Sequence, residues 1–125
     1  MNTTTAPKTS KPVNTPFYVT GEWGFVSGLT GRYGDTLVPG GFEAEFSCVL
    51  DRLQNMLAER SLTIKDIVKI NLYLCDMHNR ERLNEMYLDF FGAHLPARTV
   101  VGVTEIARKG AVELEAMVHL KAQQD

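Results

Sequence analysis

Two ionisable residues near the C-terminus, Arg98 and Glu113, are of types that could carry chemistry. Arg98 follows Pro96 and opens a predicted strand, where a guanidinium can bind a substrate carboxylate through two parallel, charge-assisted hydrogen bonds. Glu113 lies on the polar face of an otherwise apolar strand, and a partly buried carboxylate there can position or deprotonate a water molecule. Spacing alone leaves structural alternatives open, namely a surface ion pair for Arg98 and a structural salt bridge for Glu113.

Other kinds of catalytic site lack the residues that they need. The three histidines, His78, His94 and His119, do not have the spacing of a metal-ligand set. The glycine pairs have no lysine of a phosphate-binding loop, and Ser27 is not flanked as a nucleophile elbow. We therefore expect no metal site, no phosphate cradle and no acyl-transfer triad.

The elements that must position Arg98 and Glu113 follow from hydrophobic periodicity. Short strands are predicted on both sides of a turn at Gly21-Glu22, with Ser27-Gly28 closing the second, before a long glycine-rich loop. Amphipathic helices are predicted at about 41–60 and 79–91, the second one capped by Asp76 or Asn79 and stopped by Gly92, with a strand over 66–74 between the helices. The last segments, 98–103 and 111–120, are expected to form a hairpin. The order ββαβαββ predicts an α+β fold with two helices packed on one face of a mixed sheet.

Alternation within the strands predicts which residues face the helices. In the last strand Val112, Leu114, Ala116, Val118 and Leu120 form one wholly apolar face, opposite Glu113 and Glu115. In 66–74 the apolar face is expected to hold Val68, Ile70, Leu72 and Leu74, with Ile67, Lys69, Asn71 and Tyr73 opposite. This second face is too apolar for water and too polar for a core, so we expect other copies of the chain to cover it in a symmetric oligomer.

Length and composition bound the class of protein. The 125 residues, 44% hydrophobic with a net charge of -2, are typical of one domain, here 16–125, preceded by a flexible tail at 1–15 that is rich in Thr, Pro and Lys. No stretch is apolar enough to span a membrane, and the N-terminus lacks a secretory signal, which favours a cytoplasmic protein. Cys48 and Cys75 are expected to be reduced, buried thiols. The pI near 5.9 without a basic cluster argues against a nucleic-acid partner.

Several segments together resemble the YjgF/RidA reactive-intermediate (enamine/imine) deaminase family. They are the runs PARTVVGVTEIARKGAVELEAMVHL, FVSG, DIVKINLYLCDM and NEMYLDFFG, and the similarity spans about residues 18–121. The resemblance implies a chorismate-mutase-like fold assembled as a homotrimer, with an inner β-barrel and small-molecule sites between subunits. It also implies hydrolysis of enamines or imines to a 2-keto acid and ammonium, without a metal or organic cofactor.

The resemblance assigns roles residue by residue. Arg98 matches the arginine that holds the substrate carboxylate, and Glu113 matches the glutamate that positions water. Ser27 and Gly28 match a Ser-Gly loop that lines the pocket, and Asn84 matches a helix asparagine near it.

Three departures from the family pattern bear on the substrate. The position of the family's pocket tyrosine falls on Val13-Asn14, which leaves Phe17 or Tyr18 as candidate substitutes, neither of them in register. Val100 replaces a frequent cysteine, and the loop TGRYGDTLVPGG replaces a proline-bearing stretch. These changes favour a pathway-specific enamine, such as an aminomuconate-like compound, over 2-aminoacrylate.

Two other functions stay open at this point. The first is a non-catalytic trimer that binds a small carboxylate metabolite or acts like a chaperone. The second is endoribonuclease activity, which occurs in the family but is disfavoured here by the acidic pI and the lack of a basic stripe.

Overall fold

The computed structural model describes residues 12–120. Most of the predicted tail, 1–11, lies outside the described residues, and 12–15 are exposed and belong to no helix or strand. The elements are β1 (Phe17–Thr20), β2 (Trp23–Thr30), β3 (Arg32–Tyr33), β4 (Thr36–Leu37), α1 (Phe42–Ala58), β5 (Ile67–Leu74), α2 (Arg80–Phe91), β6 (Ala97–Gly102) and β7 (Val112–His119), with short 3-10 turns between some of them. This order confirms the ββαβαββ prediction and adds the small hairpin β3–β4 within the predicted loop.

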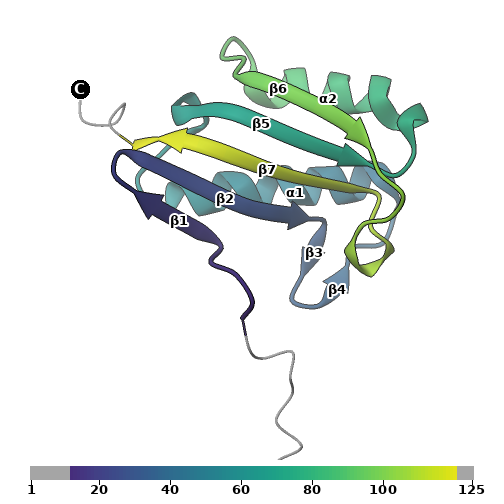
Figure 1. Ribbon diagram of the computed structural model, residues 1–125. Helices are drawn as coiled ribbons and strands as arrows, with labels where there is room; N and C mark the ends of the chain where they lie inside the picture. Colours follow the sequence, from purple (N-terminus) through teal and green to yellow (C-terminus); the bar gives the residue numbers. More distant parts are fainter. Residues whose placement is uncertain (1–11, 121–125) are drawn as a thin grey trace, which may run out of the picture.

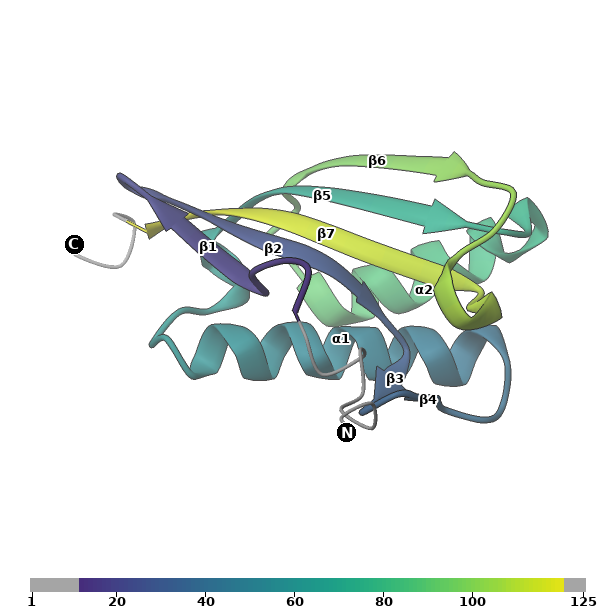
Figure 2. The ribbon, with the colours of Figure 1, turned by 60° about the horizontal axis from the view of Figure 1, so that its bottom comes forward.

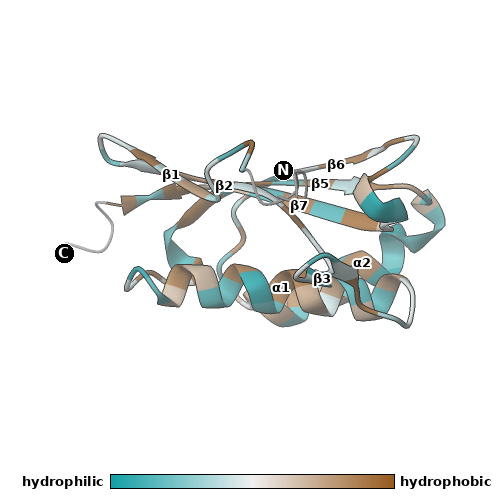
Figure 3. Cartoon of the chain, turned by 90° about the horizontal axis from the view of Figure 1, so that it is seen from below, coloured by the Kyte–Doolittle hydropathy of each residue, from teal (hydrophilic) through white to brown (hydrophobic). Residues whose placement is uncertain are grey.

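The main sheet has five strands in the order β1-β2-β7-β5-β6. All neighbours are antiparallel except β5 and β6, which are parallel, so the sheet is mixed as predicted. Both helices lie on the same side of the sheet (Figures 1 and 2), and seen edge-on the molecule has two layers (Figure 3). The other face of the sheet is not covered by any helix of the described chain.

The predicted hairpin of the last two strands is wrong. β6 pairs with β5 alone, whereas β7 lies on the other side of β5, between β5 and β2. The reason is the crossover through α2, which returns the chain parallel to β5 at the sheet edge. The long connection from Val103 to Ala111 then carries the chain past β5 to its place in the middle of the sheet.

The core fills the space between the sheet and the helices. From α1 it takes the predicted apolar stripe, in which Phe46, Val49 and Leu53 are completely buried, and Met56 is partly buried at its border. α2 ends as predicted at Gly92, whose φ of 62° suits glycine, but Asn79 makes no side-chain cap and Asp76 instead caps the preceding 3-10 turn at the His78 N–H. The apolar face of β7 packs onto this core, as alternation predicts.

Two irregularities change the predicted strand faces. Val68 was predicted to face the core and Ile67 to face the other side. Both predictions are wrong, because a register shift between Ile67 and Lys69 buries Ile67 and leaves Val68 38% exposed. A second shift, between Val26 and Leu29, lies at Ser27-Gly28, after which β2 continues to Thr30 instead of closing at Gly28. Strict alternation fails at both positions because a bulge inserts a residue into the strand.

The two cysteines differ in exposure. Both are free thiols, and Cys48 is buried as expected, but the expectation is wrong for Cys75, which is exposed just after β5 ends. Within residues 12–120, no helix has the length and apolar character that crossing a membrane requires.

Candidate functional site

Arg98 lies in a hollow between α2 and the start of β6, which we call the arginine hollow. Its volume is about 320 Å³, and it is lined by Asn84, Tyr87, Leu88, Leu95, Pro96 and Arg98. The guanidinium carbon of Arg98 lies 4.7 Å from the centroid of the Tyr87 ring, within the range of a cation–π contact. Asn84 and Arg98, predicted from sequence to share a site, are thus brought together.

The polar groups of the arginine hollow are left available to a ligand. Asn84 Oδ1 and Tyr87 Oη are buried without a hydrogen-bond partner in the described part of the chain. The Arg98 side chain makes neither a hydrogen bond nor an ion pair within residues 12–120, so its predicted alternative as a surface ion pair is not found there. Burial raises the pKa of Tyr87, and the Arg98 charge lowers it by less. Because the net shift is upward, the Tyr87 hydroxyl stays protonated and able to donate a hydrogen bond. The hollow therefore combines two donors that suit a carboxylate, the Arg98 guanidinium and the Tyr87 hydroxyl, with one acceptor, Asn84 Oδ1, that suits an N–H group.

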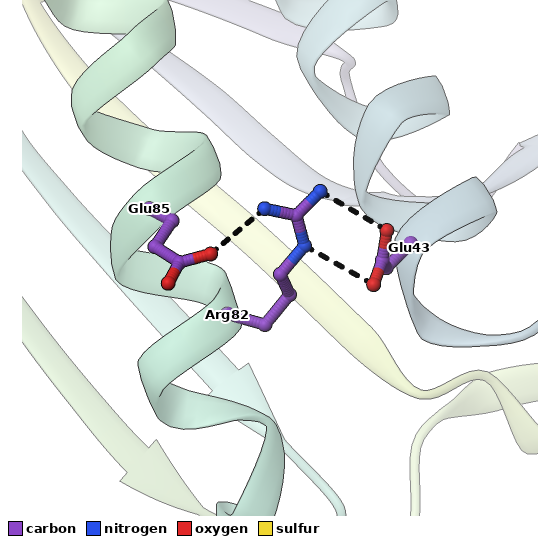
Figure 4. Close-up of polar contacts among 3 residues, drawn as sticks. All are labelled: Glu43, Arg82 and Glu85. Atoms are coloured by element: carbon purple, nitrogen blue, oxygen red, sulfur yellow. Dashed lines mark hydrogen bonds and ion pairs between the residues drawn. The ribbon is translucent and has the colours of Figure 1, made fainter.

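Exposed ion pairs link α2, which lines the hollow, to α1. Arg82 on α2 bridges Glu43 on α1, at 3.1 Å, and Glu85 on its own helix, at 2.8 Å (Figure 4). Within the sheet, Arg98 of β6 pairs in register with Ile70 of β5, which is buried in the core. Because paired residues of neighbouring strands point to the same side, the Arg98 side chain leaves the helix-covered side of the sheet.

Glu113 lies on the other side of the sheet. Glu113 belongs to β7, and its partners in register on the two neighbouring strands are Thr30 on β2 and Tyr73 on β5. A Cβ added to Gly28 would lie 1.9 Å from Glu113 Oε2, so the carboxylate packs directly over the glycine backbone at the bulge. Only glycine leaves room for it there, so Gly28 and Glu113, both predicted as site residues, lie in direct contact.

The environment of Glu113 favours its protonated form. Burial, and to a lesser degree the negative charge of Glu115, raise the pKa of Glu113 above its usual range. Glu115 instead accepts a hydrogen bond from Asn71 Nδ2 at 3.0 Å. The Glu113 side chain makes no hydrogen bond or ion pair within residues 12–120, so its structural alternative, a salt bridge, is not found there. A half-buried carboxylate with a raised pKa is suited to proton transfer.

A larger hollow, of about 580 Å³, adjoins Glu113, and we call it the glutamate hollow. Besides Gly28, Thr30 and Glu113, charged residues from two loops line it: Arg32 and Asp35 from the β3–β4 hairpin, and Arg108 from the turn before β7. Neither Arg32 nor Arg108 was predicted as a site residue, although the first lies in the glycine-rich loop and the second in the segment before the last strand.

Tyr18 and Ser27 line a third hollow, of about 340 Å³, on the uncovered face of the sheet. Ser27 Oγ donates a hydrogen bond to the Thr15 carbonyl at 2.7 Å, and Ser27 N–H donates to the Pro16 carbonyl at 3.0 Å. Tyr18 is 56% exposed and does not line the arginine hollow. One chain therefore brings the predicted site residues together in separate places, Asn84 with Arg98 on one side of the sheet, and Gly28 with Glu113 on the other.

None of the three hollows contains a set of metal ligands from the described residues. Among residues 12–120 no group of three or more His, Cys, Asp or Glu side chains could hold a metal ion. The polar groups that the chain offers a ligand are guanidinium, amide, hydroxyl and carboxyl groups.

Comparison with known proteins reveals a widespread family. The family model described as Endoribonuclease L-PSP matches residues 3–120. A 2-iminobutanoate/2-iminopropanoate deaminase from mouse is 32% identical over 123 residues, covering 94% of this chain and 87% of the mouse protein. A RutC family protein from Pyrococcus abyssi is 29% identical over 116 residues, 91% of each chain.

Solved structures agree with this grouping. A putative endoribonuclease from Thermotoga maritima superposes with a TM-score of 0.81 at 33% identity, covering 94% of both chains. Yeast Mmf1 superposes with a TM-score of 0.82 at 28% identity, covering 87% of this chain and 88% of the yeast protein.

Proposed function

This chain belongs to the Endoribonuclease L-PSP family, also called YjgF/RidA, and we propose that it hydrolyses a reactive enamine or imine to a 2-keto acid and ammonium. Curated relatives at 26–32% identity carry the name 2-iminobutanoate/2-iminopropanoate deaminase, which supports a deaminase of this general type. The observation that carries the proposal is the Arg98 guanidinium, free of protein anions within residues 12–120 and flanked by unpartnered Asn84 Oδ1 and Tyr87 Oη.

In the proposed reaction Arg98 binds the carboxylate next to the imine carbon. Glu113 takes a proton from water while the water oxygen attacks the carbon of the protonated imine, and the C=N electron pair collects on the nitrogen to give a carbinolamine with a neutral amino group. Glu113 then passes its proton to that nitrogen, the C–N bond breaks as ammonia leaves, and Glu113 takes the hydroxyl proton as the C=O bond of the keto acid forms and transfers it to the ammonia to give ammonium. A protonated imine is already a good electrophile, so positioning and electrostatics suffice without a covalent nucleophile.

The proposed site requires two copies of the chain. Arg98 and Glu113 lie on opposite sides of the sheet in one subunit, and the uncovered face carries side chains that are neither a core nor an ordinary surface, including Lys69, Asn71 and Tyr73. We propose a homotrimer in which Arg98 and Asn84 of one subunit meet Gly28 and Glu113 of the next.

The test is keto-acid release from an imine generated in situ by an amino-acid oxidase or a threonine dehydratase. We expect the wild type to accelerate release, Arg98→Ala to lose about 100-fold in kcat/KM, and Arg98→Lys to recover only part, because lysine cannot form the paired hydrogen bonds. Arg80, an exposed residue of α2 outside the hollow, provides the matched control Arg80→Gln, expected at wild-type rate. Full activity in Arg98→Ala, or no acceleration with any amino-acid-derived imine, would refute the proposal.

The pH profile tests the role of Glu113. Because the carboxylate form accepts the proton and burial raises the pKa of Glu113, kcat/KM is expected to fall as the pH drops through a value above the usual glutamate range. Glu113→Gln should abolish that acidic limb together with most of the activity. Tight binding of a 2-keto acid without turnover would instead favour the non-catalytic metabolite-binding trimer.

A further inference from the structure

Two arginines, Arg32 and Arg108, line the glutamate hollow. Arg32 belongs to β3, directly after β2, and Arg108 belongs to the turn that leads into β7. Two segments that are more than 70 residues apart thus bring cations to the hollow that also contains Glu113. The proposed mechanism uses neither of them.

The backbone holds Arg108 in a restricted conformation. Its φ of 60° is in the left-handed region, which non-glycine residues rarely adopt, and Lys109 has the same φ. Arg108 Nη2 lies 3.2 Å from Asp35 Oδ1 on the β3–β4 turn, so the two loops are tied together across the hollow. The side chain is therefore directed by both its backbone and its partner.

The charge balance of the hollow favours an anion. Arg32 donates to the Gly34 carbonyl and has no carboxylate partner within residues 12–120. Arg52, from α1 beneath, donates to the Thr30 carbonyl at 2.7 Å, and its pKa is lowered mainly by burial and then by the nearby charge of Arg32. Of the charged residues that line the hollow, Arg108 is paired with Asp35, whereas Arg32 has no carboxylate partner, so the charge of Arg32 is available to one further carboxylate.

We propose that Arg32 and Arg108 form a second anion subsite, which selects substrates carrying a second carboxylate distal to the imine carbon. The inference rests on the proposed function for the placement of the first carboxylate on Arg98 and of the reacting carbon near Glu113. The substrate class is then an enamine or imine of a dicarboxylic acid.

Binding of keto-acid products tests the subsite without any turnover. The probes are 2-oxoglutarate, which has two carboxylates, and 2-oxobutanoate, which has one, titrated into the full chain by calorimetry. We expect 2-oxoglutarate to bind about tenfold more tightly, since one charge-assisted hydrogen bond is worth about that factor. Arg32→Gln should abolish the preference by weakening 2-oxoglutarate alone, and Arg32→Lys should retain part of it. Arg80→Gln, which removes the same charge elsewhere, should retain all of it.

The outcomes separate the subsite from the proposed reaction. Equal affinity for the two acids, or an unchanged preference in the double variant Arg32→Gln/Arg108→Gln, would overturn the subsite even if imines are hydrolysed. An arginine-dependent preference without turnover would support the subsite while refuting the deaminase. Two competition results would overturn the assignment of the subsite to a carboxylate. The first is that inorganic phosphate competes with 2-oxobutanoate more strongly than 2-oxoglutarate competes with it. The second is that a single-stranded RNA binds through Arg32 and excludes 2-oxoglutarate.

Discussion

The two faces of β7 divide the tasks of the molecule between alternate residues of one strand. Toward the helices, Val112, Leu114 and Val118 are completely buried in an apolar layer. Toward the uncovered side, Glu113 and Glu115 are half-buried among polar groups of β5. The helix-covered face of β7 is packed within one chain and supplies stability, whereas on the uncovered face the Glu113 side chain has no hydrogen-bond or ion-pair partner within residues 12–120. Adjacent residues of this strand can therefore be changed with very different consequences.

The largest expected effect is on the helix-covered face. Leu72→Ala should lower the free energy of unfolding by about 2–5 kcal/mol, because Leu72 is completely buried and its truncation leaves a cavity. Val68→Ala, on the same strand but exposed at the register shift, should change it by less than about 0.5 kcal/mol. Chemical denaturation measures both, and equal losses would contradict the division between covered and exposed positions.

On the uncovered face the next effect is on activity. Gly28→Ala should reduce kcat/KM by about 10- to 100-fold, since the new methyl group overlaps Glu113 Oε2 and must displace the carboxylate. The unfolding free energy should change little, because the displaced atoms are the end of a flexible side chain. A variant that is unstable but, when folded, fully active would show that Gly28 serves the fold and not the site.

A smaller effect follows from the raised pKa of Glu113. The folded state retains the proton at pH values where the unfolded state, with a pKa of about 4.3, has lost it, so stability falls as the pH rises from about 4 through the folded pKa. Glu113→Gln has no such group and should become more stable relative to the wild type over that window. Denaturation at a series of pH values measures this difference, and a constant difference between the two proteins would mean that the carboxyl group is not held in its protonated form.

The smallest effect is on the outer surface of the helices. Arg82→Gln removes exposed ion pairs to Glu43 and Glu85 and should lower the thermal midpoint only slightly. The loss should vanish in about 1 M salt, which screens such pairs. A loss that persists in high salt would indicate that Arg82 stabilises α2 by packing instead of by charge.

Local pattern predicted the elements but not their pairing. The stripe of α1 and the alternation of β7 depend on neighbouring residues, and both predictions are confirmed. Strand order depends on contacts between distant residues, which is why β6 was predicted to pair with β7 although it pairs with β5. The bulges at Ser27-Gly28 and Val68 have no clear periodic signal, so alternation misassigned the residues around them.

The candidate site was predictable to a similar extent. Alternation identified the face of Glu113, and the helical spacing of Asn84 and Tyr87, three residues apart, could have identified Tyr87 as a partner in the arginine hollow. The side of the sheet on which Arg98 lies depends on the parallel register with β5, which no local pattern contains. Arg32 and Arg108 were missed because only the folded chain brings their loops together.

The unequal exposure of the two cysteines provides a practical tool. Cys48 is buried and Cys75 is exposed, so a maleimide dye should attach selectively at the end of β5 without any engineered residue. Fluorescence depolarisation by energy transfer between identical dyes would then report how many subunits come together, and at what protein concentration they separate.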